Sequence, residues 1–125
     1  MQPQETPQQK TIRLGNYLRT HRRRAGLSLR ELGHLLGYSD EGAVLRHEKS
    51  ETIPPLLIGV AYEVVFRVPL KELFTGLHET VELTMEARIL ELEIELQRKP
   101  VQGDRGKSVA QKLAWIDERR AALEN

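Results

Sequence analysis

The chain has 125 residues, of which 39% are hydrophobic and 30% charged, a composition typical of one folded domain with an appendage rather than of a disordered or fibrous protein. It contains no cysteine and no run approaching the ~18 apolar residues of a membrane-spanning helix, so we expect no disulfide, no membrane contact and a cytoplasmic location. The net charge of +1 divides unevenly, because residues 1–76 carry 11 basic and 8 acidic side chains whereas residues 77–125 carry 8 and 10.

The first segment predicts a flexible N-terminal arm, since residues 1–10 are rich in Gln and Pro and have no apolar periodicity. A helix is expected over residues 12–24, where Leu14, Leu18 and His21 recur at helical spacing. Four arginines crowd its C-terminal half: Arg19, Arg22, Arg23 and Arg24. Cations at this end either stabilise the helix through its dipole or contact phosphate groups.

Residues 27–37 predict a short second helix whose start and end are both marked. Ser28 and Glu31 have the spacing of a capping box, in which the hydroxyl and the carboxylate bond free amides of the first turn. Gly37 suits the end of the helix, because glycine takes a positive φ without steric cost. The apolar side of this helix is expected to consist of Leu29, Leu32, Leu35 and Leu36.

A third helix is expected after a tight turn. Ser39 can cap it, with Asp40 and Glu41 in the first turn, where the helix dipole stabilises negative charge. Ala43 and Val44 are the side chains expected to face the core. Helices this short are marginal in water, so the flanking sequence must supply the core that holds them.

Two further helices complete this part of the chain. Pro55 suits the first position of a fourth helix that runs to about Val65. Its composition is strongly apolar, so we expect it to pack as the back of the core. A fifth helix is expected from Pro69 to Phe74. Residues 11–76 therefore predict one all-α domain of five helices.

Several segments of this domain, taken together at their separations, resemble the phage-repressor-like Cro/Xre family of helix-turn-helix proteins. They are L-x-x-H-R-x-x-A-G-L-S at 18–28, x-E-L-G-x-L-L-G-Y-S at 30–39, A-V-L-R-H-E-K at 43–49, Pro54, and V-P-L-K-E-L-F at 68–74. The resemblance implies a lambda-repressor-like bundle that places its third helix in the major groove of duplex DNA. It also implies a sequence-specific transcriptional regulator, with repression as the expected mode.

The resemblance assigns roles to individual residues. Arg22 and Glu48 match an ion pair of the family between the first helix and the end of the third. Arg46 is the first candidate to read a base or a phosphate, since its guanidinium can bond two guanine acceptors. The DNA-binding candidates are Arg19, Arg22, Arg30, Ser39, Asp40, Glu41, Gly42, Arg46 and Lys49.

Four residues depart from the family pattern and keep a second function open. Leu29 stands where the family usually has a glutamine that contacts a phosphate. Asp40 and Glu41 either stabilise a helix start or accept a hydrogen bond from cytosine, and they repel a polyanion. Leu45 stands where the family often has a small polar residue. The alternative is an antitoxin-like or adaptor protein that keeps the fold and acts through protein contacts.

Residues 77–125 predict a separate hairpin of two helices. The first is expected over residues 77–99 and ends at Pro100. A capping box at Ser108 and Gln111 predicts the start of the second, which runs to about Leu123. The first helix has one heptad-like apolar row at Val81, Met85, Ile89, Leu92 and Leu96, and another at Leu83, Ala87, Leu90 and Ile94. The second helix can cover one of these rows with Val109, Leu113 and Ile116.

The second helix therefore leaves part of this apolar surface uncovered, and we expect the hairpin to bind a second copy of the chain. A two-fold dimer would match a palindromic operator with half-sites about 34 Å apart. The candidates for this contact are Val81, Met85, Ile89, Leu92, Leu96 and Trp115. The alternatives are a monomer whose hairpin folds back on its own bundle, and a different protein bound through the hairpin.

No pattern in the sequence predicts catalysis, a metal or a cofactor. The four histidines lack metal-ligand spacing, and there is no phosphate-binding loop, dinucleotide fingerprint or nucleophile elbow. Single-stranded nucleic acid is a weaker candidate than duplex DNA, because aromatic residues are only 5% of the chain and form no stacking platform. The expected partners are double-stranded DNA and a second copy of the chain.

Overall fold

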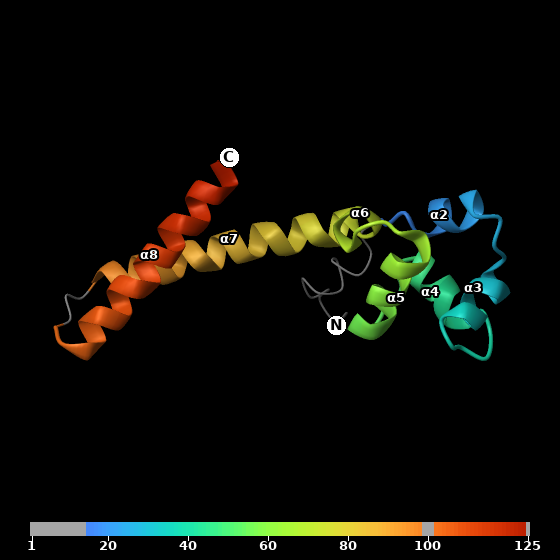
Figure 1. Ribbon diagram of the computed structural model, residues 1–125, viewed down its shortest axis with the longest axis horizontal. Coiled ribbons are helices and arrows are strands. Elements are labelled where there is room, and N and C mark those ends of the chain that lie inside the picture. The colour runs from blue at the N-terminus through green and yellow to red at the C-terminus, as the bar shows by residue number, and fades with distance from the viewer. Residues whose placement is uncertain (1–14, 99–101, 125) are drawn as a thin grey trace, which may run out of the picture. The chain divides into compact units, whose positions relative to one another are not determined.

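The computed structural model describes residues 15–98 and 102–124, and the regular structure within these ranges is all helical, which confirms the expected all-α class. The helices are α2 (Leu18–Arg24), α3 (Leu29–Leu35), α4 (Gly42–Glu48), α5 (Leu56–Phe66), α6 (Leu70–Leu73), α7 (Thr75–Arg98) and α8 (Asp104–Glu124) (Figure 1). The chain divides within α7 into two compact units, Met1–Val81 and Glu82–Asn125. None of the helices in the described ranges is long and apolar enough to cross a membrane.

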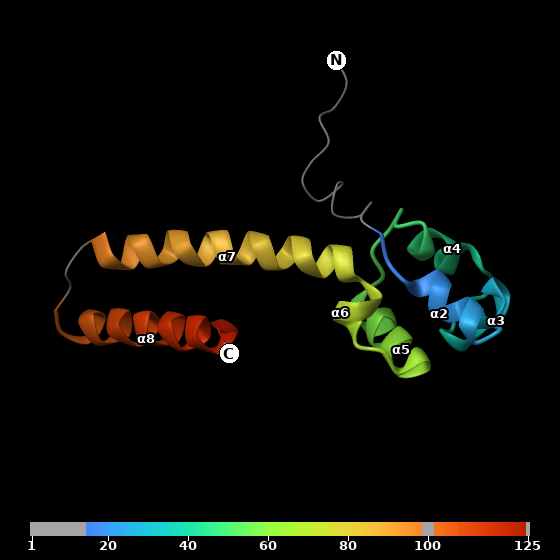
Figure 2. The same ribbon diagram turned by 90° about the horizontal axis from the view of Figure 1, so that it is seen from above.

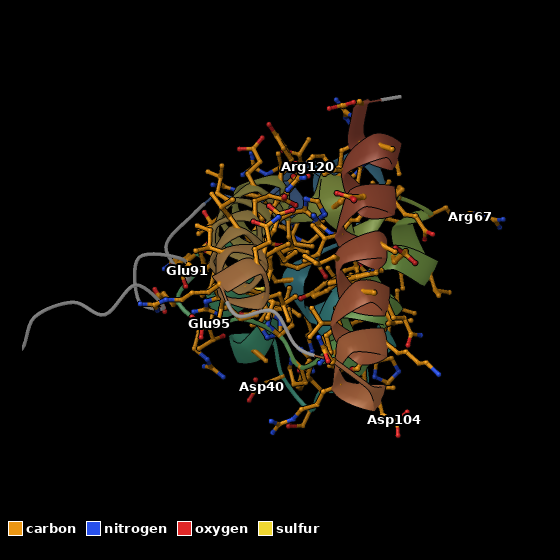
Figure 3. All side chains as sticks on the ribbon, turned by 90° about the vertical axis from the view of Figure 1, so that its left-hand side faces the viewer. Asp40, Arg67, Glu91, Glu95, Asp104 and Arg120 are labelled. Atoms are coloured by element: carbon orange, nitrogen blue, oxygen red, sulfur yellow. The ribbon has the colours of Figure 1, made fainter. Side chains whose placement is uncertain are left out.

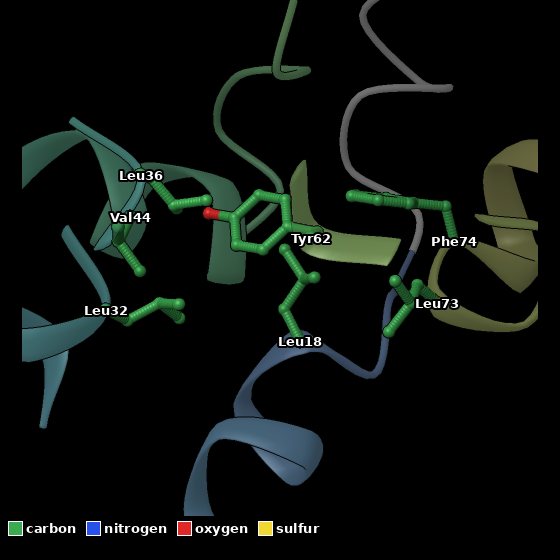
Figure 4. Close-up of a cluster of buried hydrophobic side chains, with 7 residues drawn as sticks. All are labelled: Leu18, Leu32, Leu36, Val44, Tyr62, Leu73 and Phe74. Carbon is green, nitrogen blue, oxygen red and sulfur yellow. The ribbon is translucent and has the colours of Figure 1, made fainter. Parts of the chain in front are cut away.

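The first unit has a core built around Tyr62 of α5, which is fully buried. The side chains clustered with it are Leu18, Leu32, Leu36, Val44, Leu73 and Phe74. Figure 4 shows the Tyr62 ring between Leu36 and Val44 on one side and Leu73 and Phe74 on the other. Since α2, α3 and α4 have only seven residues each, this shared core is what stabilises them as helices.

α3 begins and ends where the sequence predicts. The Ser28 hydroxyl accepts a hydrogen bond from the Glu31 amide at 3.0 Å, and the Glu31 carboxylate accepts one from the Ser28 amide at 2.9 Å. Gly37 follows the helix with a φ of +90°. The predicted apolar side is wrong at Leu35, which is 58% exposed, because Leu32 and Leu36 already fill the space against Tyr62.

Gly33 brings α3 directly against the loop that leads to α4. A Cβ atom at residue 33 would lie 2.7 Å from the Asp40 carbonyl oxygen, which is far inside van der Waals contact. The Gly33 carbonyl also accepts a hydrogen bond from the Tyr38 amide at 2.9 Å. The turn between the two helices is therefore packed on the backbone of α3, and this contact sets the position of α4.

Two helix starts in the first unit differ from prediction. Residues 15–17 are not helical and α2 begins at Leu18, whose amide donates to the Asn16 side-chain oxygen at 3.0 Å; the arm and residues 12–14 lie outside the described residues. α4 begins at Gly42 with Glu41 at the N-cap position, so Ser39 is not its cap. The Asp40 carboxylate accepts the Gly42 amide at 2.9 Å, which forms an Asx-turn just before the helix.

The boundaries of the last two helices also differ. α7 begins at Thr75 rather than at residue 77. α8 begins at Asp104, so Ser108 lies inside the helix and caps nothing. The preceding Gly103 has a φ of +75° and its carbonyl accepts the Lys107 amide at 3.1 Å, which closes the first turn four residues before the predicted start. The expected stop at Pro100 falls outside the described ranges.

α5 is not the packed back of the core. Its side chains Leu56, Leu57 and Val64 are 77%, 78% and 69% exposed, and Gly59 and Tyr62 are its buried residues. One face of the helix meets the Tyr62 cluster while the opposite face stays open, a division that apolar composition alone does not predict. An apolar hollow of about 270 Å³ opens beside this face, between α5, α6 and the first turns of α7.

The second unit is an antiparallel pair in which α8 runs back alongside the C-terminal part of α7 (Figure 2). Arg119 of α8 bonds the carboxylate of Glu86, and Arg120 bonds that of Glu93 at 2.9 Å. Ile116, at 2% exposed, is the single fully buried side chain among the described residues of this unit. The pair is thus held by two ion pairs and a thin apolar seam.

Candidate nucleic-acid interface

α4 is fixed to the core along its inner side. Val44 is fully buried and His47 is 4% exposed. The Nδ1 atom of His47 lies 2.8 Å from the Tyr62 hydroxyl, so the two rings share a buried hydrogen bond between α4 and α5. Burial lowers the pKa of His47 and raises the pKa of Tyr62. Both groups are therefore held in their neutral forms at physiological pH.

The expected ion pair between Arg22 and Glu48 is present. Arg22 Nε lies 2.6 Å from Glu48 Oε2, and Arg22 Nη2 lies 3.2 Å from Oε1. The Nη1 group donates to the Leu27 carbonyl at 3.0 Å. The bond to Glu48 raises the pKa of Arg22, and all three guanidinium nitrogens are engaged within the protein. Arg22 thus helps to fix the position of α4 from within the protein.

Asn16 is a further anchor of α4 that sequence reasoning missed. Its side-chain amide donates to the His47 carbonyl at 2.9 Å and to the Ser50 hydroxyl at 3.1 Å, while its oxygen accepts the Leu18 amide. One side chain therefore joins the start of α2 to the end of α4. An asparagine just before a helix is a typical capping signal, but its second set of bonds depends on the tertiary fold.

The outer side of α4 and the loop before it face solvent. The exposed candidates here are Ser39, Asp40, Glu41, Arg46 and Lys49, while Gly42 and Leu45 are half-buried. Asp40 projects away from the ribbon (Figure 3). The structure thus brings together, on one exposed strip, the residues that the resemblance assigns to DNA contact around α4.

The Asp40 carboxylate and the Arg46 guanidinium group both lie close to Gly42, the first residue of α4. A Cβ atom at residue 42 would lie 3.1 Å from the Asp40 carboxylate and 3.3 Å from Arg46 Nη1. The guanidinium group therefore folds back over Gly42 toward the carboxylate. The Asp40 carboxylate accepts the Gly42 amide and lies near the positively charged guanidinium group of Arg46, which fits the interpretation that this acid stabilises the start of the helix.

The remaining basic candidates are exposed. Arg19 lies on α2, Arg30 on α3 and Lys49 directly after α4. Within the ranges that the structure describes, no carboxylate lies within ion-pair distance of any of the three. Their charges are free to meet phosphate groups, which position a protein on a duplex without reading its sequence.

Of the departures from the family pattern, Leu29 has a clear structural explanation. Leu29 packs against the Tyr62 cluster, so a residue that could not contact phosphate contributes to the core instead. Leu45 is half-buried on α4 beside the exposed Arg46. Glu41 is exposed and its side chain caps nothing, which leaves one carboxylate on the strip without a structural role.

The hairpin residues expected to contact a second copy differ in their exposure. Met85, Ile89 and Leu96 are half-buried on α7. Val81, Leu92 and Trp115 are between 41% and 48% exposed. The other apolar row of α7 is the more open one, since Leu83 is 74% exposed, Leu90 52% and Ile94 57%. In the structure the second row is therefore the more exposed apolar surface of α7, whereas the sequence predicts the contact at the first row.

Among the described residues no group of three or more histidines and acids is placed to hold a metal ion. No family model, curated protein or solved structure matches the chain.

Proposed function

We propose that the chain is a sequence-specific regulator of transcription that binds duplex DNA through α4, in the manner of the Cro/Xre repressors it resembles. The observation that carries the proposal is the contrast between the two sides of α4. Its inner side is tied to α2 and α5 through Arg22, Asn16 and His47. Its outer side presents Arg46 and uncommitted polar groups to solvent.

A helix anchored in this way loses little conformational freedom when it enters a groove. Arg46 is the base reader, with a guanidinium that can bond the O6 and N7 atoms of guanine. Arg19, Arg30 and Lys49 contact the phosphate backbone. Repression follows if the bound protein covers promoter DNA. Two copies, acting in the cytoplasm on two half-sites, would give the operator its symmetry.

The test measures binding to a duplex selected from a random pool and to an unselected duplex of equal length, by fluorescence anisotropy. Replacing Arg46 with alanine should weaken the selected complex about 10- to 100-fold, the value of one good bidentate base contact. The loss on the unselected duplex should be much smaller. Lys71→Ala is the matched control, because Lys71 is an exposed cation of the same unit outside the proposed interface.

Two results would count against this assignment. Equal losses on both duplexes would reduce Arg46 to a phosphate contact, and the absence of any binding at low salt would favour the second candidate function. That candidate is an antitoxin-like or adaptor protein, favoured by the exposed apolar face of α5 at Leu56, Leu57 and Val64. Large apolar patches on a folded domain commonly mark protein contacts.

A further inference from the structure

α7 carries an exposed apolar row that no described part of the second unit covers. Leu83, Ala87, Leu90 and Ile94 follow one another at steps of four, three and four residues, the spacing of a heptad seam. All four are exposed, and the row carries no charge although acids crowd the same helix.

α8 occupies a different side of α7. It is bound there through Glu86 and Glu93, beside the half-buried Met85 and Ile89. Glu91 and Glu95 project from the side of α7 that faces away from α8 (Figure 3). The apolar row is therefore separate from the seam of the hairpin. Since the hairpin has one fully buried side chain among its described residues, covering this row would add substantially to the apolar area that it buries.

We propose that a second copy of the chain covers this row, so that the two α7 helices form a parallel two-stranded coiled coil. The residue types argue for this occupant. In heptad terms Ala87 and Ile94 are the a positions and Leu83 and Leu90 the d positions. In parallel coils a β-branched residue at a, here Ile94, with leucine at d favours two strands over three or four. The same chain supplies a matching row, so one two-fold contact covers both copies.

The charges beside the row fit a parallel arrangement. In a parallel coil Glu93, which also bonds Arg120 of its own hairpin, faces Arg98 of the second copy, an opposite-charge pair. Glu86 faces Glu91 of the second copy, but its charge is already compensated by Arg119 of its own hairpin. In an antiparallel coil Glu86 would face Glu93, each compensated only by an arginine of its own hairpin, and no basic residue of α7 would face either of them.

A parallel coil brings the N-terminal ends of both α7 helices together. The first units of the two copies are then attached to the same end of the coil. This contact goes beyond the proposed DNA binding and does not depend on it, so it is tested with the protein alone.

The absence of native cysteines makes disulfide trapping a clean test. Leu90→Cys should give a covalent dimer under mild oxidation in non-reducing gel electrophoresis, because d positions of a parallel coil face each other. Leu92→Cys is the matched control, since Leu92 is 41% exposed on the same helix but outside the row, and it should stay monomeric on the gel. Cross-linking only when Leu90→Cys is mixed with Ala87→Cys or Ile94→Cys would show an antiparallel contact and overturn the proposal.

Sedimentation of charged variants gives a second readout. Leu90→Glu should raise the dissociation constant of the dimer about 100-fold or more, the loss of one buried leucine from each copy, while Leu92→Glu should leave it within a few-fold. Circular dichroism of both variants checks that the helices persist. A wild-type chain that sediments as a monomer at micromolar concentration, or equal effects of the two substitutions, would overturn the proposal.

Discussion

At the scale of single residues, the bond between His47 and Tyr62 joins the candidate DNA-reading helix to the centre of the core. Both side chains are buried, and the structure leaves no described buried side-chain nitrogen or oxygen atom without a partner. Burial lowers the pKa of His47, so the folded protein binds a proton at this site less readily than the unfolded chain. The burial of this one side chain therefore makes stability depend on pH.

The sign follows from linkage. The stabilising effect of keeping His47 neutral is fully present above the pKa of this residue in the unfolded chain, about 6.5. It is lost as the pH falls from there through the lowered pKa of His47 in the folded protein. The free energy of unfolding, measured by urea titration, should therefore fall between pH 7.5 and pH 5.5. A His47→Gln variant should lose part of this dependence. An identical pH profile for both proteins would show that His47 stays neutral, or charges without cost, in this range.

The local hydrogen bond itself is tested separately by Tyr62→Phe. This change removes the hydroxyl and leaves the buried Nδ1 atom of His47 without its partner. We expect a loss of about 1 to 3 kcal/mol in the free energy of unfolding at neutral pH. Tyr38→Phe is the control, because Tyr38 packs edge-on against the same histidine, whereas the Nδ1 atom of that histidine is bonded to Tyr62, and this change should cost much less.

At the scale of elements, the turn between α3 and α4 depends on the missing side chain of Gly33. A methyl group there would meet the Asp40 carbonyl oxygen at 2.7 Å, and backbone on both sides gives little room for relief. Gly33→Ala should therefore destabilise the fold by about 1 to 3 kcal/mol and displace α4. Thermal unfolding measures the first effect and DNA binding the second. Gly15→Ala, where a Cβ meets nothing within 4 Å, should leave both nearly unchanged.

Elements defined by neighbouring residues could be predicted from the sequence. The capping box of α3 and the turn at Gly37 are local, so their residues specify them directly. The start of α4 is also local, because Asp40 bonds the Gly42 amide two residues on, but sequence reasoning assigned that position to Ser39. The bonds of Asn16 to the end of α4 are not local, because they depend on which segments meet in the fold. α5 shows the same limit, since its apolar residues indicated burial but not which face would be covered. The Arg22–Glu48 pair was expected from the resemblance alone.

At the scale of the whole molecule, the basic side chains around α4 should make duplex binding depend on salt. Each phosphate contact releases condensed counterions, so the logarithm of the binding constant falls linearly with the logarithm of the salt concentration. Arg30→Ala should lower the magnitude of that slope by about one and weaken all sequences alike. Lys71→Ala should leave the slope unchanged. A slope that Arg30→Ala does not alter would remove this residue from the interface.

The anchoring of α4 from behind has a consequence for how such a protein can change. Asn16, Arg22 and Tyr62 hold the helix by atoms that never face outward, whereas Ser39, Glu41 and Arg46 contribute nothing to that hold. Under the proposed function, substitutions at Ser39, Glu41 or Arg46 can therefore alter the preferred DNA sequence while the bonds that hold α4 stay intact. Asp40 is the exception, because the same carboxylate faces solvent and accepts the Gly42 amide. Apart from that residue, the side chains that would choose the DNA sequence and those that maintain the fold can change independently of each other.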